Sequence, residues 1–217
     1  MIKPSFLVWF SAFFFFFSLY VTAPTIAVYA GNIYSSTALV GITVGVYGAT
    51  MVLARIPIGV LASFLGKRKQ LIQAGLVLIS LGLLLAFIPK PIFLIVSRAL
   101  LGLGAGFWVL YTVLYSSYFA KEKLPQAMSR ISVAYGLSQI VAALVGGYAS
   151  DKWGWLAPFA IGIGSSLLAL FIIIPLKEEV NKDHQWTFKK FTGAINKKLL
   201  LISLLAMVGF FVAFSTL

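Results

Sequence analysis

Residues 37–62 read TALVGITVGVYGATMVLARIPIGVLA, a run of 26 residues in which Arg55 is the only charged side chain. In a helix, about 20 apolar residues cover the roughly 30 Å hydrocarbon core of a bilayer. Every backbone polar group inside that core must find its partner within the segment, and a helix meets this condition by itself. The run therefore predicts a transmembrane helix.

Six further apolar stretches of similar length flank this one, with short polar breaks between them. They are Ser5–Tyr29, Leu71–Ile88, Ile92–Phe119, Ile131–Ser150, Trp155–Leu176 and Leu199–Leu217. The 217-residue chain is 61% hydrophobic and its mean hydropathy is +1.02, as expected of a protein that lies in lipid. The sequence predicts an all-α polytopic membrane protein. Residues 1–176 form a six-helix transmembrane bundle, residues 177–198 a basic cytoplasmic linker and residues 199–217 the start of a seventh helix.

The net charge of +12 is distributed unevenly along the chain. Thirteen of the 17 lysines and arginines lie at the amino terminus or in every second connection: Lys3; Lys67, Arg68 and Lys69; Lys121, Lys123 and Arg130; and the six lysines of residues 177–198. Cytoplasmic connections of membrane proteins are enriched in lysine and arginine. We therefore predict a multi-pass protein of the cell membrane with a cytoplasmic amino terminus. Because the basic residues follow the topology, we expect no nucleic-acid partner.

A short pattern occurs twice, 88 residues apart, at the ends of the second and fifth stretches. In each copy a glycine is followed by a short polar residue and then by a second glycine: Gly59, Ser63 and Gly66 in one, Gly147, Asp151 and Gly154 in the other. The offset equals three helices, so the two copies have opposite orientations in the membrane. Inverted three-helix repeats are an architecture of secondary transporters. The sequence predicts a bundle of two such repeats.

Three motifs also resemble those of the major facilitator superfamily. Gly59-x-Leu61-Ala62-Ser63-x-x-Gly66-Lys67-Arg68 is similar to the signature loop between its helices two and three. Arg98-x-x-x-Gly102-x-Gly104-Ala105-Gly106 resembles its helix-four motif, and Gly146-Gly147 with Asp151 and Gly154-Trp155 resembles its junction of helices five and six. Ser63 stands where the family usually has aspartate, which puts a charge-based latch at this loop in doubt.

The resemblance implies a function and a partner. It covers the whole chain as the amino-terminal half of a secondary transporter that moves a small organic solute by alternating access. The chain would then be a fragment that works with a second, carboxy-terminal six-helix half. The first motif would form a cytoplasmic gate and the last an outer junction. The alternative is a non-transporting membrane subunit or interaction partner made from half a transporter.

Polar residues are concentrated on one face of the first, second, fourth and fifth stretches, counted at about 100° per residue. We predict a solute cavity lined by Thr22, Thr25, Tyr47, Arg98, Trp108, Thr112, Tyr115 and Gln139. Tyr20 and Tyr111 would also suit an aromatic solute. The third and sixth stretches are expected to face lipid. Helix packing is the alternative explanation of the polar faces, and it is favoured for Gly41-x-x-x-Gly45 and Gly102-x-x-x-Gly106.

Arg98 is the sharpest single prediction. An arginine at the centre of a membrane helix costs roughly 2.5–3.5 kcal/mol on insertion scales, so it usually faces a cavity or a partner. The alternative is a side chain that extends to the outer interface. All five acidic residues lie at the ends of the apolar stretches or between them, and the single histidine, His184, lies in the linker. We therefore expect neither enzyme activity, nor a metal site, nor a cofactor.

Overall fold

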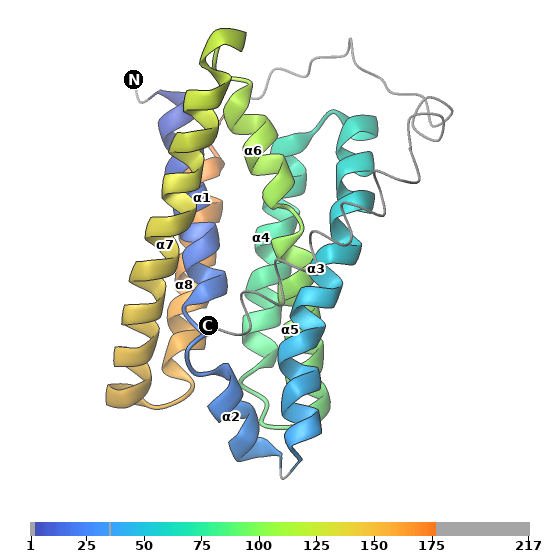
Figure 1. The fold of residues 1–217 in the computed structure, drawn as a ribbon, viewed down its shortest axis with the longest axis vertical. Coiled ribbons are helices and arrows are strands. Elements are labelled where there is room, and N and C mark those ends of the chain that lie inside the picture. Colours follow the sequence, from blue (N-terminus) through green and yellow to red (C-terminus); the bar gives the residue numbers. More distant parts are fainter. Residues whose placement is uncertain (1–2, 35, 177–217) are drawn as a thin grey trace.

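The computed structural model describes residues 3–34 and 36–176, and within these residues every regular element is a helix (Figure 1). In chain order the elements are α1 (Pro4–Tyr20), α2 (Ile26–Ile33), α3 (Thr37–Leu65), α4 (Arg68–Leu85), α5 (Pro91–Ala105), α6 (Trp108–Ser116), the 3-10 turn η1 (Lys121–Lys123), α7 (Leu124–Trp153) and α8 (Ala157–Ile173). The predicted linker, 177–198, and seventh helix, 199–217, lie outside the described residues.

Four helical stretches are long and apolar enough to cross a bilayer: Thr37–Leu65, Arg68–Leu85, Pro91–Ser116 and Lys121–Trp153. α1 and α8 are apolar helices of 17 residues each. Together they account for the six stretches predicted within residues 1–176, so the all-α membrane fold is confirmed.

The first and fourth stretches differ from the prediction, because each is broken into two helices. α1 ends at Tyr20 and α2 begins at Ile26; between them lies Pro24, which has no N–H to continue the helical ladder. α5 ends at Ala105, where the Gly106 N–H is shared between the carbonyls of Gly102 and Leu103 (both 3.1 Å). The breaks come at matching places, after 17 residues of α1 and 15 residues of α5.

The helices are arranged in two rows (Figure 1). In one row α5 packs between α3 and α4, and in the other α1 packs between α7 and α8; α4 and α8 join the rows. In the two predicted repeats α1 corresponds to α5, α3 to α7 and α4 to α8. With this correspondence, each helix contact within one row matches a contact within the other row. The short helices α2 and α6 lie at opposite ends of the bundle. This arrangement is the one that two inverted three-helix units produce.

The two repeated glycine pairs occupy equivalent places. Gly66 follows the last residue of α3 with φ 61°, and Gly154 follows α7 with φ 85°. These are the only positive φ angles within residues 3–34 and 36–176. A residue without a Cβ adopts such angles without steric cost, and glycine commonly ends helices for this reason. The first glycines of the pairs, Gly59 and Gly147, have open space where a side chain would be.

Glycines also set the closest helix contacts. A Cβ on Gly102 would collide with the carbonyl oxygen of Tyr47 and with Thr50 Oγ1 on α3, and one on Gly106 would come within 2.9 Å of Ala54. The packing interpretation of this pair is confirmed. For Gly41 and Gly45 it stays a prediction, because no atom of residues 3–34 and 36–176 lies within 4 Å of a Cβ at either position.

α4 and α8 each have one buried and one exposed face. The Oγ atoms of Ser80 on α4 and Ser166 on α8 are 2.8 Å apart, in a hydrogen bond that joins the two rows. The opposite faces expose apolar side chains, among them Leu81 and Leu84 on α4 and Phe171 on α8. Such faces suit contact with lipid tails, as expected for the third and sixth stretches.

Candidate functional site

Arg98 lies inside the bundle, with only 6% of its surface exposed. Its guanidinium carbon is 4.6 Å from the centroid of the Tyr47 ring, which joins α5 to α3. A cation over an aromatic face is attracted by the ring quadrupole, and burial strengthens this contact to about 2 kcal/mol. The Nε atom of Arg98 has no hydrogen-bond partner in the part of the chain that the structure describes.

Within the described residues the charge of Arg98 has no acidic counterpart nearby. The acids among the described residues are Glu122, in η1, and Asp151, in the last turn of α7, and neither lies inside the bundle. A second cation, Arg55 of α3, also interacts with Tyr47, and its Nη2 donates to Met51 Sδ at 3.7 Å. This part of the bundle therefore carries an uncompensated positive charge.

The second row of helices contributes neutral polar groups. The hydroxyl oxygens of Tyr20, on α1, and Tyr135, on α7, are 3.2 Å apart. The Tyr20 hydroxyl also lies near the side chains of Gln139, one turn beyond Tyr135, and of Tyr47 in the other row. Tyr20 thus connects the polar groups of α7 with the Arg98–Tyr47 pair.

Aromatic rings complete the site. The Phe16 ring lies 4.4 Å from the Trp108 ring and 4.6 Å from the Tyr135 ring, both in edge-on contacts, with distances measured between centroids. Such contacts are a favoured geometry of aromatic pairs. We call the whole group the Arg98 cluster: Phe16, Tyr20, Tyr47, Arg98, Trp108, Tyr135 and Gln139. Its guanidinium and hydroxyl groups can donate to an anion, and its rings offer flat apolar surface.

Four of the eight predicted cavity residues belong to this cluster: Tyr47, Arg98, Trp108 and Gln139. Thr112 lies nearby, one turn beyond Trp108, but its hydroxyl donates to the Val109 carbonyl of its own helix (2.7 Å). The cluster also contains Phe16 and Tyr135, which the sequence analysis missed. Tyr135 precedes Gln139 by four residues and so shares its helical face, a signal that could have identified it.

Three predicted cavity residues lie elsewhere. Thr22 and Thr25 are buried in the break between α1 and α2, and the Thr25 hydroxyl donates to the Thr22 carbonyl (3.3 Å). Tyr115 is buried at the far end of α6, where its ring packs on Phe119 at 5.0 Å. Tyr111, predicted as a solute-facing aromatic residue, is fully buried with its hydroxyl 2.8 Å from Ser11 Oγ. None of these four residues belongs to the Arg98 cluster, and their place in a solute cavity stays a prediction.

The predicted gate motif forms the turn from α3 to α4. Gly66 ends α3, Lys67 is exposed and Arg68 begins α4, while Leu61 is 44% exposed. Ser63, in place of aspartate, donates to the carbonyl of Val60 (2.8 Å) and so stays within its own helix.

Lys69 makes the long-range contact of this turn. Its Nζ donates to the carbonyl oxygens of Ile174 (2.6 Å) and Leu176 (2.8 Å), beyond the last turn of α8. Both carbonyls follow the last residue of α8, and a cation is favoured at this end of the helix dipole. In the predicted outer junction Asp151 is exposed and Gly147 is half-buried.

Comparison with known proteins gives the chain its relatives. The model of the Major Facilitator Superfamily matches residues 8–217. An uncharacterised transporter of Buchnera aphidicola (subsp. Schizaphis graminum) is 32% identical over 152 residues, which cover 68% of this chain and 38% of the relative. The multi-drug resistance efflux pump PmrA of Streptococcus pneumoniae is 31% identical over 163 residues, 72% of this chain and 40% of the pump.

A solved structure shows the same fold. The crystal structure of a POT peptide transporter bound to alafosfalin superposes with a TM-score of 0.75 and 20% identity, covering 96% of this chain and 46% of the transporter. The chain spans less than half the length of each of these relatives. The helical rows, the matched glycines and the family match agree, and the chain belongs to the Major Facilitator Superfamily.

Proposed function

We propose that this chain is one half of a secondary transporter that carries a small organic solute through the cell membrane by alternating access. Its partner is a carboxy-terminal six-helix half, and its amino terminus lies in the cytoplasm. PmrA is named for multi-drug efflux and the POT transporter for peptides, which supports an organic solute. The observation that carries the proposal is the buried, uncompensated charge of Arg98 beside the Tyr20–Tyr135 pair.

The Arg98 cluster is this half's share of the solute site. A cation buried in the membrane raises the free energy of the protein, and no acid of this half balances Arg98 within the described residues. Such a cation is therefore expected where a solute or the other half supplies the negative charge. The turn from Gly59 to Arg68 is the proposed cytoplasmic gate. Gly147, Asp151 and Gly154 belong to the proposed outer junction.

The test is transport by the complete protein in vesicles, normalised to the amount of protein in the membrane. Arg98→Lys keeps the charge but loses the planar group that holds carboxylates in a bidentate manner, so we expect strongly reduced transport at unchanged abundance. Arg98→Ala should transport less still and insert at least as well, because a costly charge is removed. Undiminished transport by Arg98→Ala would overturn this role for the cluster.

The second candidate function is a non-transporting membrane subunit or interaction partner. Copurification separates the two functions. A transporter half should copurify with a second six-helix segment and the pair should move solute, whereas a subunit should bind a partner without any solute flux.

A further inference from the structure

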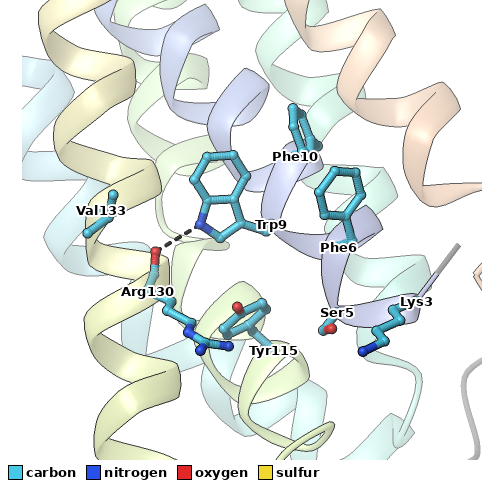
Figure 2. A pocket seen from close by; sticks show the side chains of 8 residues that line it. All are labelled: Lys3, Ser5, Phe6, Trp9, Phe10, Tyr115, Arg130 and Val133. Carbon is cyan, nitrogen blue, oxygen red and sulfur yellow. Dashed lines mark hydrogen bonds between the residues drawn. The ribbon is translucent and has the colours of Figure 1, made fainter.

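An open cavity lies away from the Arg98 cluster, at the end of the bundle where α1 begins. Its volume is about 600 Å³, and it is lined by residues of α1, of the last turn of α6 and of the first turns of α7. Figure 2 shows its lining: Lys3 and Arg130 lie on either side of Tyr115, with the rings of Trp9, Phe6 and Phe10 beyond them. No acidic side chain lines it.

The two cations of this cavity lie at the same depth. Lys3 comes two residues before the apolar stretch that begins at Ser5, and Arg130 comes directly before the stretch that begins at Ile131. Both therefore mark the boundary between water and hydrocarbon. Trp9 lies just inside this boundary, where tryptophan is enriched in membrane proteins.

A backbone hydrogen bond holds Arg130 in place and does not involve its guanidinium group. The indole N–H of Trp9 donates to the backbone carbonyl of Arg130 at 2.8 Å, as the dashed line in Figure 2 shows. The guanidinium group interacts with Tyr115 and forms no ion pair within the described part of the chain. Lys3 also forms no ion pair there. Two cations are thus held beside one aromatic cavity with their charges available.

We propose that this cavity binds a phospholipid with an anionic headgroup, drawn from the membrane leaflet at this end of the bundle. The phosphate lies between Lys3 and Arg130, and an acyl chain lies along Phe6 and Phe10. Phe6 is 54% exposed, so lipid can reach it from the bilayer. A lipid phosphate matches these two cations better than the linker would, because residues 177–198 carry six lysines against three acids.

The experiment uses the full 217-residue chain in nanodiscs of phosphatidylglycerol mixed with phosphatidylcholine. Native mass spectrometry counts the lipids that stay bound after release. We expect one retained phosphatidylglycerol in preference to phosphatidylcholine. Since each cation near a membrane surface strengthens anionic-lipid binding by about fivefold, Lys3→Gln and Arg130→Gln should each weaken retention by about this factor. Both residues are exposed, and Arg130→Gln leaves its backbone carbonyl for Trp9.

Lys121→Gln with Lys123→Gln is the matched control, because it removes two exposed cations from the same end of the bundle without touching the cavity. Retention should be unchanged in this control. An equal loss in the control would overturn the proposal in favour of diffuse surface attraction. Displacement of the retained lipid by excess inorganic phosphate would also overturn it, since the cavity would then be a site for a free anion.

Discussion

Gly102 of α5 lies directly against the backbone carbonyl of Tyr47 on α3. One helical turn earlier, Arg98 lies over the ring of the same tyrosine. The absence of a side chain at Gly102 thus fixes how closely the two helices approach, and this approach brings Arg98 to its aromatic partner. Helix packing and the candidate site depend on one contact.

Gly102→Ala should destabilise the bundle. The new Cβ would overlap the Tyr47 carbonyl oxygen and Thr50 Oγ1, and overpacking of this kind costs about 1–3 kcal/mol. The melting temperature in detergent should fall, and transport should fall further because Tyr47 is displaced. Gly45→Ala is the control, since its Cβ meets open space and should have no such effect.

Removing a tyrosine hydroxyl should affect transport inside the Arg98 cluster and thermal stability outside it. Tyr20→Phe removes a hydroxyl that faces Tyr135 in the proposed solute site, so transport should fall, while the loss of one such hydrogen bond costs only about 1 kcal/mol of stability. Tyr111→Phe removes a hydroxyl in the packed interior, so it should lower the melting temperature and leave transport intact. Equal transport by both variants would mean that Tyr20 only packs.

The two helix-ending glycines should differ in their tolerance of alanine. Gly66, at φ 61° and ψ 9°, is in the left-handed helical region, where a Cβ costs about 1–2 kcal/mol. Gly154, at φ 85° and ψ 173°, is in a region reserved almost entirely for glycine, so Gly154→Ala should be the more damaging. Thermal unfolding measures the order. Gly59→Ala and Gly147→Ala, which meet open space, should be neutral or stabilising.

Lys69 should hold the end of α8 in place. Lys69→Met keeps most of the side-chain stem but loses both hydrogen bonds to Ile174 and Leu176, at a cost of about 1–2 kcal/mol. Amide hydrogen exchange in the last turn of α8 should then become about tenfold faster, because 1.4 kcal/mol corresponds to a factor of ten. Lys67→Met serves as the control. It removes an exposed cation of the same turn and should leave exchange in α8 unchanged.

Labelling of single cysteines tests the proposed orientation. The chain contains no cysteine of its own, and Lys67 and Lys123 lie at one end of the proposed topology while Lys90 and Asp151 lie at the other. An impermeant thiol reagent added outside cells should label cysteines only at positions 90 and 151. Labelling of positions 67 and 90 from the same side would contradict the helix assignment.

The sequence predicts where the helices lie better than it predicts which face each residue occupies. The breaks between α1 and α2 and between α5 and α6 explain this difference. Apolar runs identify the helices because lipid admits few other structures. Hydropathy does not detect the break at Pro24, however, because the two threonines near it, Thr22 and Thr25, are too few to interrupt the apolar stretch. Thr25 and Tyr115 were assigned to faces by counting 100° per residue through a break, where that count no longer applies. Arg98 precedes the break in its stretch, and its side chain contacts Tyr47 of the neighbouring helix α3, as the predicted polar face requires.

The two halves of this bundle are alike when it is turned over, so its helix packing cannot by itself distinguish the two sides of a membrane. The distinction lies in a few side chains that follow the matched glycines. Gly66 is followed by Lys67, Arg68 and Lys69, whereas the three residues after Gly154 are uncharged. Because lysine and arginine decide which connections stay in the cytoplasm, insertion in one direction depends on this difference in charge at two equivalent turns. A substitution of the exposed Lys67 can leave the helix packing unchanged and still alter which way round the protein enters the bilayer.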